Sequence, residues 1–227
     1  MTLININDIT IYFDHKEDKA IINEVFFEDT YRVSEIPEKS TVLDIGAHIG
    51  TFAIRCAHER RCIVYAYEPS SRNFRLLVKN IELNHLRDKI KAFNQGVTKR
   101  SEMRTFYFRP TGPQSSSFFF HADTPYEEEI AQCITLKRVF EDNHILSCGT
   151  LKMDCEEAEK EIFTDEFSSY IKSVDYIIVE WHNYDGHIYA HYLEKLGFSV
   201  LLTGTGLPQP KYDPSFARGM LYAHKVS

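Results

Sequence analysis

The sequence of 227 residues has few cysteines, no excess of basic residues and no long apolar run. Its five cysteines include no C-x-x-C pair, which argues against a zinc ribbon or a dithiol redox site. We expect five reduced thiols in a cytoplasmic protein, because disulfides are rare in that compartment. No stretch approaches roughly 18 consecutive apolar residues, and the first residues do not follow the pattern of a secretory signal, so we expect no membrane segment.

The charge balance argues against partners that present phosphate groups. Acidic residues outnumber basic ones, and the net charge is −7. Long-range attraction to nucleic acid or to an anionic membrane is weak for such a chain, so we expect neither as a partner. A hydrophobic content of 43% with 26% charged residues is ordinary for a globular domain with its own core.

The length suits one domain, which we place at residues 41–227, with residues 1–40 as a lead-in segment that packs on it. From residue 41 onward, apolar runs typical of buried strands alternate with segments of helical periodicity. Strands are predicted at residues 41–46, 62–67, 91–93, 150–154 and 176–180. The alternation predicts an α/β fold, a parallel sheet with helices on both faces that ends in an antiparallel hairpin of residues 198–202 and 220–224.

Three other regions carry weaker patterns. Residues 109–126 are rich in proline, glycine and serine and predict a loop insertion. Residues 156–170 are predicted to form a helix. The runs 9–13 and 24–31 each fit either an edge strand or a lead-in helix.

The strongest motif is V-L-D-I-G-A-H-I-G-T at residues 42–51, a strand that leads through two glycines into a helix. Glycine there lets the backbone pass close to a ligand at the carboxyl end of the sheet. Gly46 and Gly50 are four positions apart with no third glycine, so the turn suits a dinucleotide pyrophosphate poorly. Glu68 ends the next strand, where a carboxylate can accept hydrogen bonds from both hydroxyls of a ribose. Together these features predict a nucleoside site.

Four segments resemble the FkbM-type class I S-adenosylmethionine-dependent methyltransferases: VLDIGAHIGTFAI, YAYEP followed by FRLLVKNIELN, LKMDCEEAEKEIF, and IIVEWH. The resemblance spans residues 40–224 and implies a Rossmann-like fold with a mostly parallel seven-stranded sheet. It also implies an enzyme that uses S-adenosyl-L-methionine as cofactor. The favoured reaction is O-methylation of a hydroxyl on a small molecule, such as a sugar or a polyketide-type metabolite.

The resemblance also assigns the cofactor site. It implies that Asp44 and the turn at Gly46 hold the methionine part, that Glu68 holds the ribose, and that residues 94–97 flank the adenine. The predicted cofactor-binding residues are Asp44, Gly46, Ala47, His48, Gly50, Thr51, Glu68, Pro69, Gln95, Gly96 and Asp154. Glu157 departs from the family pattern, which usually has glycine there.

Methyl transfer to a hydroxyl is helped by a base that removes its proton. Our first candidate is His182, with Asp154 or Glu156 as alternatives, because these residues end two neighbouring strands. Asp154 could instead only anchor the cofactor, and Glu156 could only favour a helix start. Together, Asp154, Glu180 and His182 could also collect a divalent cation, although we assign no metal ligand.

Acceptor contacts are predicted in two segments. In residues 114–126, hydroxyl groups accompany three consecutive phenylalanines, and the loop either covers the site or packs its rings into the core. Residues 181–187 are dense in hydrogen-bonding groups and aromatic rings. The predicted substrate residues are Ser116, Phe119, Trp181, His182 and Tyr184.

Two other functions remain open at this stage. A nucleotide-binding oxidoreductase would share the strand-turn-helix motif but lacks the expected further glycine. A non-catalytic S-adenosylmethionine-binding module would keep the cofactor site without a base.

Overall fold

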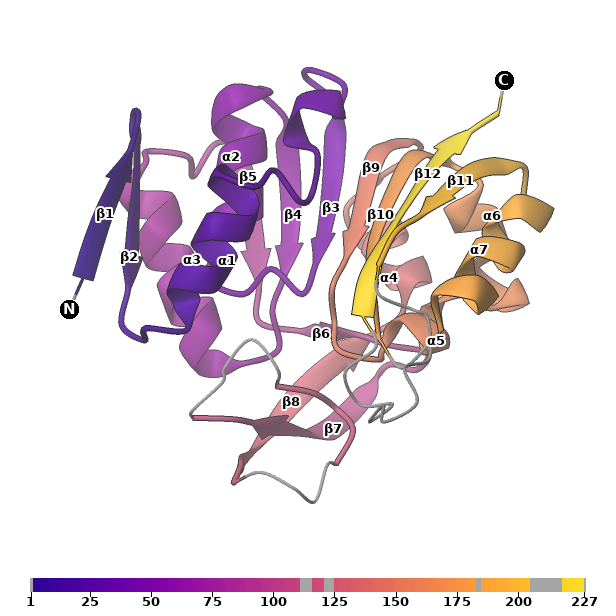
Figure 1. Ribbon diagram of the computed structural model, residues 1–227. Coiled ribbons are helices and arrows are strands. Elements are labelled where there is room, and N and C mark those ends of the chain that lie inside the picture. Colours follow the sequence, from indigo (N-terminus) through magenta and orange to yellow (C-terminus); the bar gives the residue numbers. More distant parts are fainter. Residues whose placement is uncertain (1, 111–115, 121–124, 183–184, 205–217, 227) are drawn as a thin grey trace, which may run out of the picture.

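A computed structural model describes residues 2–110, 116–120, 125–182, 185–204 and 218–226 (Figure 1). Its centre is a seven-stranded sheet with the order β11-β12-β10-β9-β3-β4-β5. The strands, in chain order, are β3 Thr41–Ile45, β4 Ile63–Tyr67, β5 Ile90–Phe93, β9 Cys148–Met153, β10 Val174–His182, β11 Phe198–Leu202 and β12 Arg218–Lys225. Only β12 runs antiparallel to its neighbours. The predicted sheet and its closing antiparallel hairpin are confirmed.

Helices cover both faces of this sheet, as predicted. On one face lie α1 Asp18–Phe26, α2 Thr51–Glu59 and α3 Ser71–Leu83. The other face carries α4 Leu136–Asp142, α5 Glu159–Ile162, α6 Ser168–Ile171 and α7 Gly186–Lys195. Two short 3₁₀ helices span Val33–Glu35 and Asp165–Phe167.

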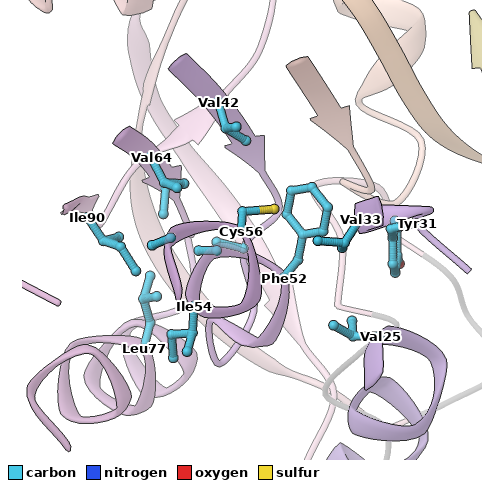
Figure 2. Close-up of a cluster of buried hydrophobic side chains, with 14 of the residues drawn as sticks. Val25, Tyr31, Val33, Val42, Phe52, Ile54, Cys56, Val64, Leu77 and Ile90 are labelled. Atoms are coloured by element: carbon cyan, nitrogen blue, oxygen red, sulfur yellow. The ribbon is translucent and has the colours of Figure 1, made fainter. Parts of the chain in front are cut away.

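Alternation along the strands divides the core into two hydrophobic clusters. Val42 and Val64 face the cluster under α2, whereas Leu43 faces the cluster on the opposite side. Figure 2 shows Val42 and Val64 turned toward α2, with Leu77 of α3 beside that helix. Because successive side chains of a strand point to opposite faces, a strand buried on both faces reads as a continuous apolar run.

Two small sheets complete the described structure. The hairpin of β1 Thr2–Ile6 and β2 Ile9–Phe13 packs on α3. A three-stranded sheet combines β6 Gly96–Val97, β7 Glu102–Phe108 and β8 Glu127–Ile134. Figure 1 shows it beyond the carboxyl ends of β3 and β4.

Several boundaries differ from the sequence predictions. The predicted helix at 156–170 is wrong as one element, because the chain there forms α5, a 3₁₀ turn and α6. Glu156 and Glu157 are left-handed, with φ of +52° and +78°, and Thr164 is extended, so no continuous helix forms. The run 9–13 is a strand, whereas residues 24–26 end α1 and residues 27–31 form turns without regular structure.

All five cysteines are unpaired, as predicted. Among the described residues, no helix is both long and apolar enough to cross a bilayer. The division of the chain at residue 40 stays a prediction. Within the predicted loop insertion, residues 111–115 and 121–124 lie outside the described part of the chain.

The buried amide of Asn80 joins the first hairpin to the core. It donates to Ile49 O at 2.9 Å and to Tyr12 O at 3.0 Å, and it accepts from Tyr12 N at 2.7 Å. Replacement by alanine leaves three buried backbone groups without this partner. We expect Asn80→Ala to lower the free energy of unfolding by about 3 kcal/mol in urea titrations. In the exposed control Asn5→Ala, the change should stay within about 0.5 kcal/mol.

Candidate active site

A cavity opens at the carboxyl ends of β3, β4 and β9, where the strand order reverses along the sheet. Its volume is about 730 Å³, the open mouth included. Ligands of open α/β sheets bind at such a point. The walls include these residues predicted from the sequence: Gly46, Ala47, His48, Thr51, Glu68, Pro69, Gln95, Gly96, Ser116, Asp154 and Glu156.

The turn after β3 forms one wall, and its shape depends on Gly46. The N–H groups of Gly46 and Ala47 both donate to Tyr67 O at 3.0 Å, which ties the turn to the end of β4. Gly46 has φ of +77°, and a Cβ there would overlap the backbone oxygen of Asp154. Glycine is therefore required, because it lets the turn lie directly against the end of β9.

Glu68 forms a second wall and is almost fully buried. Its Oε2 accepts from His48 N at 2.8 Å, and its Oε1 accepts from Ser70 N at 2.9 Å. Burial raises the pKa of Glu68 to about 7, although both N–H donors act in the opposite direction. Each carboxylate oxygen can accept a further hydrogen bond, so Glu68 can still receive hydroxyl donors.

Lys152 lies beneath the turn and was not predicted as a site residue. Its Nζ donates to Gly46 O at 2.7 Å and lies 3.2 Å from Asp44 Oδ1 and 3.9 Å from Asp154 Oδ2. Burial lowers the pKa of Lys152, but these two carboxylates more than offset this and hold it above its ordinary value. Asp44 itself is fully buried and does not line the cavity. A charged residue within the apolar run 150–154 was the available signal.

The ends of β9 and β10 bring together Asp154, Glu156, Glu180 and His182, which we call the strand-end cluster. His182 Nε2 lies 3.6 Å from Glu156 Oε2 and 3.9 Å from Glu180 Oε1. The hydroxyl of Tyr31 donates to Asp154 Oδ2 at 3.0 Å and lies 3.3 Å from Glu180 Oε2. Tyr31 comes from the segment after α1, and no pattern in the sequence linked it to these strands.

The pKa values of three groups in the strand-end cluster differ from their ordinary values. Burial raises the pKa of Glu156 to about 8 and that of Glu180 to about 7, and neighbouring carboxylates add to both shifts. Burial lowers the pKa of His182, but Glu156 and the other carboxylates around it raise it to about 9. The cluster therefore places several carboxyl groups with raised pKa values around one imidazole with a raised pKa.

A family model described as the methyltransferase FkbM domain matches residues 44–200. The chain belongs to the FkbM methyltransferase family. It is also similar to "Methyltransferase 1" of Beauveria bassiana (strain ARSEF 2860), with 22% identity over 205 residues that cover 81% of this chain and 82% of that protein.

Solved structures share the fold of this chain at low sequence identity. M. jannaschii TYW2 in complex with AdoMet has a TM-score of 0.50 and 15% identity, covering 99% of this chain and 86% of that one. The M. jannaschii tRNA m1G37 methyltransferase has a TM-score of 0.53 and 15% identity, covering 100% of this chain and 57% of that one. The FkbM-family domain thus has the class I methyltransferase fold.

The residues predicted to contact the acceptor do not all reach the cavity of the FkbM-family domain. Trp181 packs on the opposite face of the sheet, where its Nε1 donates to Thr203 O at 3.2 Å. Phe119 lies outside the wall, and Tyr184 lies outside the described residues. Phe118 lines the cavity in its place and packs in a small apolar cluster.

Two predicted residues support the cavity from behind. Gly50 has φ of +88° before α2, and a Cβ there would overlap Leu77. His182 does not line the wall itself but faces Glu156, which does. The left-handed φ of Glu157 preserves the backbone conformation that glycine adopts easily in the family pattern.

The contact at Gly46 can be tested by comparing alanine substitutions at Gly46 and at a glycine where a Cβ would meet no other atom. Gly46→Ala combines a strained φ with overlap on Asp154 O, so we expect a loss of about 3 kcal/mol or more in stability. Gly197 also has a positive φ, +93°, but an added Cβ there meets nothing within 4 Å. Gly197→Ala should therefore cost only about 1 kcal/mol, and equal losses by thermal and urea unfolding would contradict the proposed contact.

Proposed function

We propose that this protein transfers a methyl group from S-adenosyl-L-methionine to a hydroxyl oxygen of a small molecule in the cytoplasm. The observation that carries the proposal is the buried carboxylate of Glu68 in a cavity that the strand-end residues Asp154 and Glu156 also line. A carboxylate suited to ribose hydroxyls and two carboxylates suited to an acceptor hydroxyl thus line one space. Membership of the FkbM family supports the transferase class over an oxidoreductase.

The described residues fit this cofactor. Glu68 would accept from the ribose hydroxyls, and the turn from Gly46 to His48 would hold the amino-acid part. Both ring nitrogens of His48 are buried without a hydrogen-bond partner among the described residues. Burial lowers the pKa of His48 to about 4, and its Nε2 lies 3.6 Å from Asp18 Oδ1, so the imidazole braces the turn from α1. Gln95 and Gly96 would flank the adenine.

When bound, S-adenosylmethionine supplies a methyl group attached to a positively charged sulfur. The protein must hold the acceptor oxygen in line with that methyl group, exclude water and take up the hydroxyl proton. Asp154 and Glu156 line the cavity and would orient the hydroxyl, with His182 directly behind Glu156. Tyr31 fixes Asp154 and Glu180 through its hydroxyl, and burial keeps its pKa well above the ordinary value, so it remains a donor.

A small acceptor suits the charge of the cavity better than a nucleic acid does. The net charge of −7 and the carboxylates of the strand-end cluster oppose the approach of phosphate groups. A cluster that faces the cavity also argues against a module that only binds the cofactor. Purified protein incubated with S-adenosylmethionine and a panel of sugars, polyols and tRNA would separate these acceptors. Methylation of tRNA alone would contradict the proposal.

The role of Glu68 predicts a selective loss of cofactor affinity. Removing its carboxylate takes away charge-assisted hydrogen bonds to the ribose, so Glu68→Ala should weaken S-adenosylmethionine binding about 10- to 100-fold in isothermal titration. The control Glu82→Ala removes an exposed carboxylate on α3 and should bind like the wild type. Unchanged affinity in folded Glu68→Ala protein would contradict the assignment.

Binding should also release protons near neutral pH. The pKa of Glu68 lies above its ordinary value of 4.5, so its contribution to stability is complete below pH 4.5 and is lost as the pH rises through about 7. Ribose hydroxyls donate to the ionised carboxylate and favour it, so cofactor affinity should rise as the pH rises from 6 to 8.

Calorimetry at pH 6.5 in two buffers of different ionisation enthalpy measures this proton release. We expect release by the wild type and less of it by Glu68→Gln, whose amide cannot ionise. Equal release by both proteins would assign the effect to another group and would contradict the prediction.

A further inference from the structure

The strand-end cluster has the geometry of a cation site. Ligand atoms of Asp154, Glu156 and His182 all lie within 4.8 Å of one another. Two ligands bound to one cation at about 2.1 Å lie roughly 3.0 Å apart at right angles and roughly 4.2 Å apart when opposite. One divalent ion could therefore touch all three side chains after small rotations.

The three side chains converge without bonding to each other. His182 Nε2 and Glu156 Oε2 are 3.6 Å apart, which is longer than a hydrogen bond. No hydrogen bond joins Asp154, Glu156 and His182 to one another in the described part of the chain; Asp154 instead accepts from Tyr31. Partly buried carboxylates and an imidazole at this spacing leave a gap that a cation would fill.

A separate observation concerns the other side of the imidazole. His182 Nδ1 is buried without a hydrogen-bond partner among the described residues, and so is Oε2 of Glu159. The Glu159 side chain is only 1% exposed, and its carboxylate acts electrostatically on His182. Its Oε1 accepts from Cys155 N at 2.6 Å, which fixes the carboxylate in place. Groups beyond the ligands commonly tune a metal-bound imidazole, and the fixed Glu159 carboxylate can do so through its charge.

We propose that Asp154, Glu156 and His182 bind one divalent cation, and that this cation holds the acceptor. The inference rests on the proposed function and deepens it. Two carboxylates and one imidazole suit a first-row ion such as Mn²⁺ better than Ca²⁺, which prefers oxygen ligands alone. Three protein ligands leave coordination positions open, so the site selects an acceptor with two adjacent oxygens, a vicinal diol or an α-hydroxy carbonyl compound.

The cation lowers the pKa of the hydroxyl that it binds. The hydroxyl proton is then lost to solvent water. The oxygen lone pair forms the new bond to the methyl carbon. The carbon–sulfur bond breaks, its electron pair stays on sulfur, and S-adenosylhomocysteine leaves without a charge.

Titration of the full cofactor-free chain with MnCl₂ tests the site directly. Electron paramagnetic resonance of free Mn²⁺ should show one bound ion per chain. Glu156→Gln and His182→Asn, which keep the side-chain size close to the original, should each weaken binding about 10-fold or more. Asp142→Asn changes a carboxylate that pairs with Arg138 on α4 and should bind Mn²⁺ like the wild type.

Thermal unfolding provides a second readout that does not depend on activity. Mn²⁺ should raise the melting temperature of the wild type and of Asp142→Asn but not of the two cluster variants, whose folding is checked by circular dichroism. Absence of Mn²⁺ binding by the wild type, or equal binding by all four proteins, would overturn the cation site.

A parallel titration with S-adenosylmethionine separates this inference from the proposed function. Cofactor binding without Mn²⁺ binding would overturn the cation site alone. Mn²⁺ binding that is lost in the cluster variants, without cofactor binding, would support the site and contradict the proposed methyl transfer. Methylation of diols and of isolated hydroxyls at equal rates would overturn the selection of adjacent oxygens.

Discussion

The cavity depends on the direct contact between the turn after β3 and the end of β9. Gly46 permits this contact, because any side chain there would occupy the position of the Asp154 carbonyl. Lys152 stabilises this contact, because its Nζ donates to Gly46 O and its charge offsets those of Asp44 and Asp154. Isolated buried charges are costly, so these three groups stabilise the junction only as a set.

The segment before the central sheet completes the same site. The family match begins at residue 44, yet Ile21 and Val25 of α1 line the cavity. Tyr31 reaches from this segment to the ends of β9 and β10, where its hydroxyl contacts two carboxylates. The lead-in residues therefore shape both the closure of the cavity and the orientation of the strand-end cluster.

Local sequence patterns predicted the strands that are buried on both faces. They failed where contacts with distant residues determine the backbone conformation. The nearly continuous apolar run of β10 fits only a strand buried on both faces, and the spacing of apolar residues in α3 fits only a helix. The stretch 156–170 also has helical spacing, but it begins with two left-handed residues and is broken at Thr164. Strand β8 begins with three glutamates, two of them exposed, so its first three residues carry no apolar signal.

The sequence by itself determined the strands of the central sheet, the glycine turn, the acid at the end of β4 and the family. These follow from short segments, because strand, turn and helix signals depend on neighbours within a few positions. Only the tertiary structure decided that Lys152 lies under the turn and that Tyr31 joins two strand ends. Those contacts join residues distant in sequence, and only chain packing specifies them.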